Sequence, residues 1–164
     1  MDPDYAKGWL RGLKCAIAMG NMKTARNMAE QVLNLAPGFL DIVEEEVKVI
    51  KTVEKLEIEL DEALEKGNWS AALHCTEQLV QLCPFHHNAQ VQRGELLGRR
   101  GAWAGVEEVA TCVGPPSSLY ILALVPYYGF RPREALQAFA LAILADPSNR
   151  KVRVYVFFIV SFSW

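Results

Sequence analysis

The residues with the most recognisable chemistry are cysteines and histidines in the middle of the chain. They are residue types that bind zinc, and they are His74, Cys75, Cys83, His86 and His87. Structural zinc sites commonly use two closely spaced pairs of such ligands. Here the cysteines form no Cys-x-x-Cys pair, and Pro84 marks a helix end. The spacing therefore predicts no metal site.

The motifs of common enzymes are also absent from the sequence. It contains no glycine-rich phosphate loop, no Gly-x-Ser-x-Gly and no His-Glu-x-x-His. Acidic pairs are frequent, but they fall on stretches with helical periodicity, where they are typical of a solvated surface. The sequence therefore predicts a protein that is not an enzyme and needs no cofactor.

Composition narrows the class of protein further. The 164 residues include 17 basic and 19 acidic side chains, so the net charge is −2. This balance gives no whole-chain electrostatic reason to bind nucleic acid or an anionic membrane. The four cysteines are scattered, and the acidic start is not followed by the apolar core of a secretory signal. We therefore expect a cytoplasmic protein with reduced thiols, with the nucleus as a further location.

Four segments of the chain share one pattern of small residues. Glycine opens the pattern at Gly20, Gly67 and Gly101, and alanine or valine follows five residues later; Arg131-Pro132 marks the fourth turn. A small residue lets two helices approach closely, and glycine suits a tight turn between them. The pattern predicts helical hairpins that occupy 6–39, 53–86, 87–115 and 116–149.

The segment between the first two hairpins is predicted to be helix rather than linker. From Leu40 to Lys66 there is no glycine or proline, and apolar residues recur every three or four positions. A helix of this length would measure roughly 40 Å at 1.5 Å per residue. We expect it to join the last hairpin of one module, 1–39, to a second module of three hairpins, 53–149.

The hairpin pattern resembles the tetratricopeptide repeat, a unit of 34 residues with two antiparallel helices. Three sequence motifs are more specific to one family than the repeat pattern itself. They are Gln-Val-Leu-Asn-Leu-Ala-Pro at 31–37, Glu-Lys-Gly-Asn-Trp at 65–69 and Arg-Gly-Glu-Leu-Leu-Gly-Arg-Arg-Gly at 93–101. In this order they resemble a co-chaperone family of DnaJ homologues, subfamily C, over about 5–150. That family carries two repeat modules followed by a J domain.

The resemblance implies peptide binding. Modules of this kind engage heat-shock chaperones of the 70 and 90 kDa classes or their clients, and a carboxylate clamp holds the C-terminal acidic peptide Glu-Glu-Val-Asp. Lys7 and Arg11 occupy two clamp positions on one helix face, and Lys14 follows. The alternative is a solvated basic face. This chain has no His-Pro-Asp, so the resemblance implies no J-domain activity for it.

The same face of the later hairpins predicts a second groove of different character. It presents Glu54, Glu57 and Asp61 in one hairpin and Tyr120, Tyr127 and Tyr128 in another. This set suits a basic or apolar segment. The alternatives are acidic residues that solvate a long helix and tyrosines that belong to the helix-crossing core. Pro126 lies within the same helix as the tyrosines, so we expect a kink or an early end there.

The tail from Val152 to Trp164 departs from the helical pattern. It is rich in valine, phenylalanine, isoleucine and tyrosine, which favour a strand. One interpretation is an unrelated end produced by splicing; the other is an apolar plug that packs on the fourth hairpin.

Together these features predict an all-α tetratricopeptide-repeat solenoid with one long connecting helix and an atypical apolar tail at 150–164. The expected function is a co-chaperone-like adaptor between proteins, with no nucleic-acid or membrane partner. The alternatives are a scaffold subunit of another tetratricopeptide assembly and a truncated isoform without function.

Overall fold

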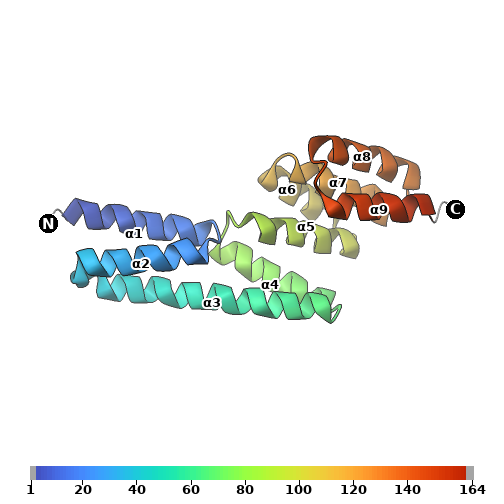
Figure 1. Ribbon diagram of the computed structural model, residues 1–164. Coiled ribbons are helices and arrows are strands. Elements are labelled where there is room, and N and C mark those ends of the chain that lie inside the picture. The colour runs from blue at the N-terminus through green and yellow to red at the C-terminus, as the bar shows by residue number, and fades with distance from the viewer. Residues whose placement is uncertain (1–2, 162–164) are drawn as a thin grey trace. The chain divides into compact units, whose positions relative to one another are not determined.

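The computed structural model describes residues 3–161, and within that range every regular element is helical (Figure 1). The elements are α1 (Pro3–Ala18), α2 (Met22–Leu35), the short 3-10 turn η1 (Pro37–Phe39), α3 (Leu40–Glu65), α4 (Trp69–Leu82), α5 (His87–Arg100), α6 (Trp103–Val113), α7 (Ser117–Tyr128), α8 (Pro132–Ala145) and α9 (Arg150–Ser161). Helices α1 and α2, α3 and α4, and α7 and α8 pack against each other in pairs. Helix α5 approaches α6 where Gly94 lies beside Val109.

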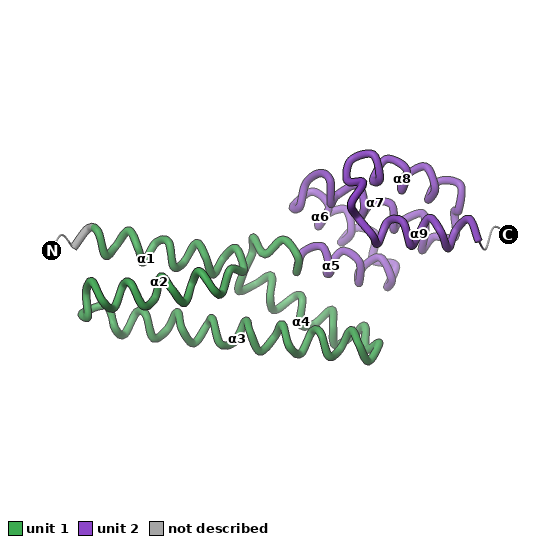
Figure 2. Tube along the Cα trace, viewed as in Figure 1, with its two compact units in different colours: residues 1–89 green, residues 90–164 purple. Residues whose placement is uncertain are grey.

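The chain divides into two compact units, coloured separately in Figure 2. Unit 1 comprises residues 1–89 and unit 2 comprises residues 90–164. The boundary falls in the first turn of α5. The division into repeat modules at 1–39 and 53–149 stays a prediction.

Unit 1 is built on two hairpins that share one long helix. Helix α2 packs on α1 and on α3, and α3 packs on α4. The small residues Ala25 and Ala72 are fully buried where the helices of each hairpin cross. Helix α3 spans 26 residues without a break, as predicted for 40–66. Its apolar stripe supplies Val43, Ile50 and Val53 to the core, so burial along most of its length stabilises one continuous helix.

The turns within the hairpins follow the glycine pattern. Gly20, Gly67 and Gly101 have φ angles of 74°, 66° and 76°, a left-handed conformation that glycine adopts without steric cost. After two of these turns an asparagine caps the next helix: the Asn21 and Asn68 side chains accept hydrogen bonds from the amides of Thr24 and Ala71.

The fourth turn differs because a bulky residue stands at the glycine position. Phe130 has a φ of 56°, and its side chain is 79% exposed. A side chain with a Cβ is strained in this region of backbone space. The hairpin therefore closes in the same geometry as the others, but at an energetic cost.

Unit 2 contains the α7–α8 hairpin, with α6 packed on α7 and α9 packed on α8. Val106, Ala135 and Phe139 are fully buried in its core. The short connection after α6 begins at Gly114, which caps that helix with a φ of 65°. Helix α7 continues through Pro126 and ends two residues later at Tyr128, so the proline lies in its last turn.

The composition of the tail favoured a strand, and this prediction is wrong for the described part, because residues 150–161 form helix α9. The helix buries Val152 and Ile159 on one face, and the Asn149 side chain accepts a hydrogen bond from the Val152 amide at its start. Packing against α8 therefore overrides the intrinsic β-propensity of these residues. Residues 162–164 of the predicted tail lie outside the described residues. In the part of the chain that the structure describes, no helix combines the length and apolarity needed to span a bilayer.

Candidate functional site: a tyrosine-lined cavity in unit 2

A cavity of about 430 Å³ opens in unit 2 between three helices that alternate along the chain, α5, α7 and α9. These are the first helices of two successive hairpins and the helix that follows them. Each contributes side chains, and the lining residues are Glu95, Arg99, Tyr120, Tyr127, Tyr128, Arg150, Lys151, Val154, Tyr155 and Phe158. We call this site the tyrosine cavity.

Tyr155 organises the aromatic wall of the cavity. Its ring stacks on Phe139 with centroids 5.3 Å apart, and it meets Tyr127 edge to face at 4.7 Å. Its hydroxyl lies 3.1 Å from the hydroxyl of Tyr128, within hydrogen-bond distance. Aromatic pairs in these geometries add to the free energy of burial, so the wall is a packed and ordered surface.

Tyr120 places a polar atom at a buried point of the cavity lining. Only 2% of the residue is exposed, and its hydroxyl is buried close to the carboxylate of Glu95. Burial raises the pKa of Tyr120 far above its ordinary value, and the nearby carboxylate of Glu95 adds to the shift. Burial likewise raises the pKa of Tyr128. Both phenols therefore stay protonated at neutral pH and can act as hydrogen-bond donors.

Charged side chains from α5 and α9 surround the aromatic wall. The Lys151 ammonium lies 2.5 Å from the Glu95 carboxylate, so these two charges offset each other. Arg99 lies over the Tyr128 ring, 5.7 Å from its centroid, in a cation–π contact. With Arg150 added, the lining carries three cations and one anion. The cavity is therefore aromatic with a net positive charge.

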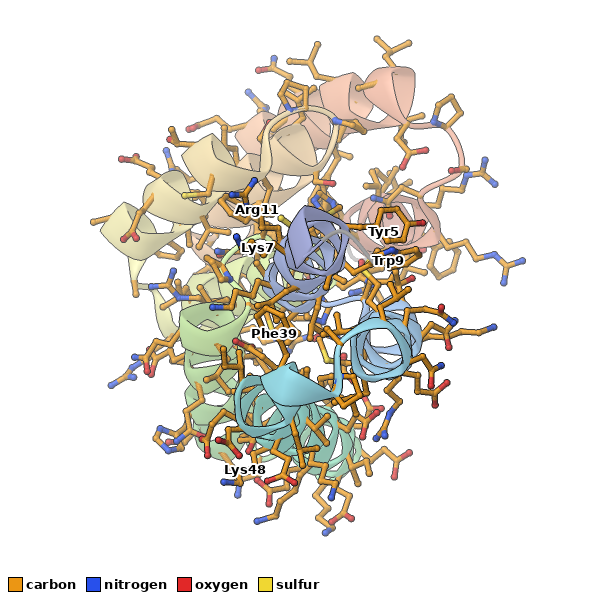
Figure 3. All side chains as sticks on the ribbon, turned by 90° about the vertical axis from the view of Figure 1, so that its left-hand side faces the viewer. Tyr5, Lys7, Trp9, Arg11, Phe39 and Lys48 are labelled. Atoms are coloured by element: carbon orange, nitrogen blue, oxygen red, sulfur yellow. The ribbon has the colours of Figure 1, made fainter. Side chains whose placement is uncertain are left out.

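The predicted clamp residues lie in unit 1, on the surface of α1. Lys7, Arg11 and Lys14 are all exposed, and the Lys14 ammonium lies 3.6 Å from the carboxylate of Glu46 on α3. Figure 3 shows Lys7 and Arg11 on one side of α1, with Tyr5 and Trp9 on the other. The predicted shared face of Lys7 and Arg11 is therefore present.

The acidic residues predicted for the second groove are positioned on α3 in unit 1. Glu54 accepts two hydrogen bonds from Arg26 on α2, at 2.9 and 2.5 Å, and this contact lowers the pKa of Glu54. Glu57 lies 3.1 Å from the His86 ring nitrogen, and Asp61 is exposed. Two of the three acids thus link elements of unit 1. The three tyrosines predicted for the same groove belong to unit 2.

The tyrosine cavity includes residues that sequence reasoning missed. Tyr155, Lys151 and Phe158 lie on α9, which was interpreted as a strand-like tail. The spacing of Val152, Tyr155 and Ile159 is helical and was the available signal. Among the described residues, no three His, Cys, Asp or Glu side chains gather as metal ligands.

The fold was compared with solved structures. The tetratricopeptide-repeat domain of P58(IPK) superposes with a TM-score of 0.71 and 11% identity, which covers 98% of this chain and 46% of that one. The tetratricopeptide-repeat domain of Arabidopsis OM64 gives a TM-score of 0.51 at 14% identity, covering 68% and 97%. The chain therefore has the all-α tetratricopeptide-repeat solenoid fold.

Sequence comparison gives a more particular similarity. The chain is 24% identical over 156 residues to human DnaJ homolog subfamily C member 7, which covers 92% of the chain and 31% of that protein. The mouse protein of the same name is 24% identical over 159 residues, covering 94% and 32%. The chain thus spans about a third of the length of the curated relatives it matches. No protein-family model matches the sequence.

Proposed function

We propose that this chain is a protein–protein interaction adaptor of the co-chaperone type, which binds segments of heat-shock chaperones or their clients. The observation that carries the proposal is similarity to DnaJ homolog subfamily C member 7 along 92% of the chain, together with a tetratricopeptide-repeat fold. Repeat solenoids present extended surfaces that suit other polypeptides. A cytoplasmic location is part of the same proposal.

The site proposed for the chaperone tail is the basic strip of unit 1, formed by Lys7, Arg11 and Lys14. An acidic C-terminal peptide carries several carboxylates, and hydrogen bonds between ionised partners are the stronger kind. The residues are exposed on α1, and Lys7 and Arg11 share one side of it. Because the strip supplies few cations, we expect weak binding that falls as salt rises.

The test is a calorimetric titration of a Glu-Glu-Val-Asp peptide into the full chain and into the double variant Lys7→Ala/Arg11→Ala. We expect measurable binding by the wild type and about tenfold weaker binding by the variant, since two charge-assisted contacts are lost. The matched control is Lys48→Ala/Lys51→Ala on α3, which removes the same charge from exposed positions of unit 1. Absent wild-type binding, or equal losses in both variants, would refute the proposed site.

A further inference from the structure

Helix α9 buries one narrow stripe and leaves a wide apolar face open to solvent. Val152 and Ile159 are buried, and the helix packs on α8. The helix carries no charged residue after Arg153 within its described length. Its other side presents four apolar side chains that are between 43% and 66% exposed, namely Val154, Phe157, Phe158 and Val160. The second half of α9 therefore offers a continuous apolar surface.

The size of this face indicates that it is covered by a partner. The four side chains present on the order of 400 Å² per copy, given that one aromatic side chain alone contributes roughly 150–250 Å² when fully exposed. Monomeric proteins rarely expose larger apolar patches. The helix has only 12 residues and is rich in valine, which has a low helix propensity. A partner on this face would therefore stabilise α9 as well as remove apolar surface from water.

The spacing of residues on α9 suits a second copy of the same helix. The stripe opposite the buried one recurs at intervals of four, three and four residues, and consists of Arg150, Val154, Phe157 and Ser161. This is the spacing of the seam positions in a coiled coil. In an antiparallel pair centred between Val154 and Phe157, each of these side chains lies against the other one in the partner copy. Arg150 then lies beside Ser161 of the partner copy.

The charges of α9 favour the antiparallel arrangement over the parallel one. The basic residues Arg150, Lys151 and Arg153 are all in the first turn of the helix. An antiparallel pair places them near the last turn of the partner helix, whose free carbonyl groups carry a partial negative charge. A parallel pair would instead bring the cations of both copies together. The helix is therefore complementary to itself in charge as well as in shape.

The same residues disfavour an anionic membrane as the occupant of this face. The Lys151 ammonium is 2.5 Å from the Glu95 carboxylate, and the Arg153 guanidinium donates a hydrogen bond to the carbonyl oxygen of Pro147. The chain as a whole has a net charge of −2. Because an interfacial helix depends on basic charge as well as apolar area, α9 has little electrostatic attraction to anionic lipid.

We propose that α9 pairs antiparallel with α9 of a second copy and forms a two-fold symmetric dimer. This surface goes beyond the proposed chaperone function, because it lies in unit 2 and needs no chaperone segment. The pair hides on the order of 800 Å² of apolar surface, below the roughly 1,200–2,000 Å² of a standard interface. We therefore expect a weak dimer that is populated at about 100 µM and dissociated at about 1 µM.

Sedimentation velocity of the full chain over this concentration range tests the dimer. The buffer is reducing, because the exposed thiols of Cys15 and Cys112 would otherwise cross-link copies. We expect Phe157→Glu to weaken dimerisation at least about tenfold, since it places a charge in the apolar seam. The matched control is Phe85→Glu, the same substitution at a side chain of unit 1 that is also exposed, and it should leave dimerisation unchanged. Circular dichroism at about 1 µM should show both variants folded.

Substitutions at Ser161 test the orientation of the two helices. Ser161 is exposed at the end of α9 and faces Arg150 of the partner copy in the antiparallel pair. We expect Ser161→Glu to tighten the dimer about threefold and Ser161→Lys to weaken it about threefold. Within one copy, glutamate at this end of a helix is unfavourable and lysine is favourable. A tighter dimer in Ser161→Glu would therefore not result from a more stable helix.

Four outcomes would overturn the proposal. Two are a wild-type chain that remains monomeric at about 300 µM and a Phe157→Glu variant that dimerises as well as the wild type. The third is weakening by both Ser161→Glu and Ser161→Lys, which would contradict the antiparallel pairing. The fourth is binding of wild type to phosphatidylserine vesicles without self-association, which would assign the face to a membrane.

Discussion

Units 1 and 2 are built from similar helical hairpins, yet different kinds of side-chain contact connect their helices. In unit 1 the acids predicted for a groove bind neighbouring elements: Glu54 pairs with Arg26, and Glu57 contacts His86. In unit 2 the helices meet through the packed rings of Tyr127, Phe139 and Tyr155, beside the ion pair of Lys151 with Glu95. Polar contacts therefore connect helices of unit 1, whereas aromatic packing contributes most of the contacts around α9 in unit 2.

The largest expected effect concerns the aromatic core behind the tyrosine cavity. Phe139 is fully buried and stacks on Tyr155, so Phe139→Ala should lower the free energy of unfolding by about 3–5 kcal/mol. Urea denaturation followed by circular dichroism measures the change. The matched control is Phe157→Ala at a side chain that is 66% exposed, for which we expect a change within about 0.5 kcal/mol. Equal effects would contradict the placement of Phe139 in the core.

A second comparison sets two turns of unit 1 against each other. A Cβ added at Gly20 would overlap the His86 ring, whereas the nearest atom to one added at Gly67 lies 3.9 Å away. Both positions have positive φ. We expect Gly67→Ala to cost about 1–2 kcal/mol through backbone strain alone, and Gly20→Ala about 2–4 kcal/mol because overpacking is added.

Thermal denaturation of the two alanine variants tests this difference directly. The melting temperature should fall further for Gly20→Ala than for Gly67→Ala. A double variant Gly20→Ala/His86→Ala should recover part of the loss, because the smaller side chain removes the overlap. Equal melting temperatures for the two single variants would show that the His86 ring does not restrict the turn at Gly20.

The smallest effect should be a gain in stability at the fourth turn. Phe130 has a φ of 56° and is 79% exposed. Phe130→Gly should therefore remove backbone strain and lose little buried apolar surface. The greater freedom of glycine in the unfolded chain offsets part of the gain. We expect a net rise in the free energy of unfolding of about 0.5–1 kcal/mol. A fall would mean that the exposed ring makes a stabilising contact.

Much of the fold was predictable because its signals are local. Glycines at the hairpin turns, buried alanines at the helix crossings and an unbroken stretch from Leu40 to Glu65 each have one physical interpretation. The helical state of the tail was not predicted, because valine and phenylalanine favour strands when considered alone. Its helix is stabilised by Val152 and Ile159, whose burial depends on the position of α8.

The candidate site was predicted only in part, for the same reason. Tyr120, Tyr127 and Tyr128 were assigned to a groove from the repeat register. Their association with Tyr155 and Lys151 depends on how α9 packs, which periodicity within one segment does not specify. The acids of α3 were grouped with them by register alone, whereas the ion pair of Glu54 with Arg26 is a tertiary contact.

Nuclear magnetic resonance of the isotopically labelled chain during titration with the Glu-Glu-Val-Asp peptide is the most direct test of the proposed chaperone-tail site. We predict chemical-shift changes concentrated on α1 around Lys7 and Arg11, which fade as salt is added. No changes at all, or changes confined to unit 2, would contradict binding at the basic strip.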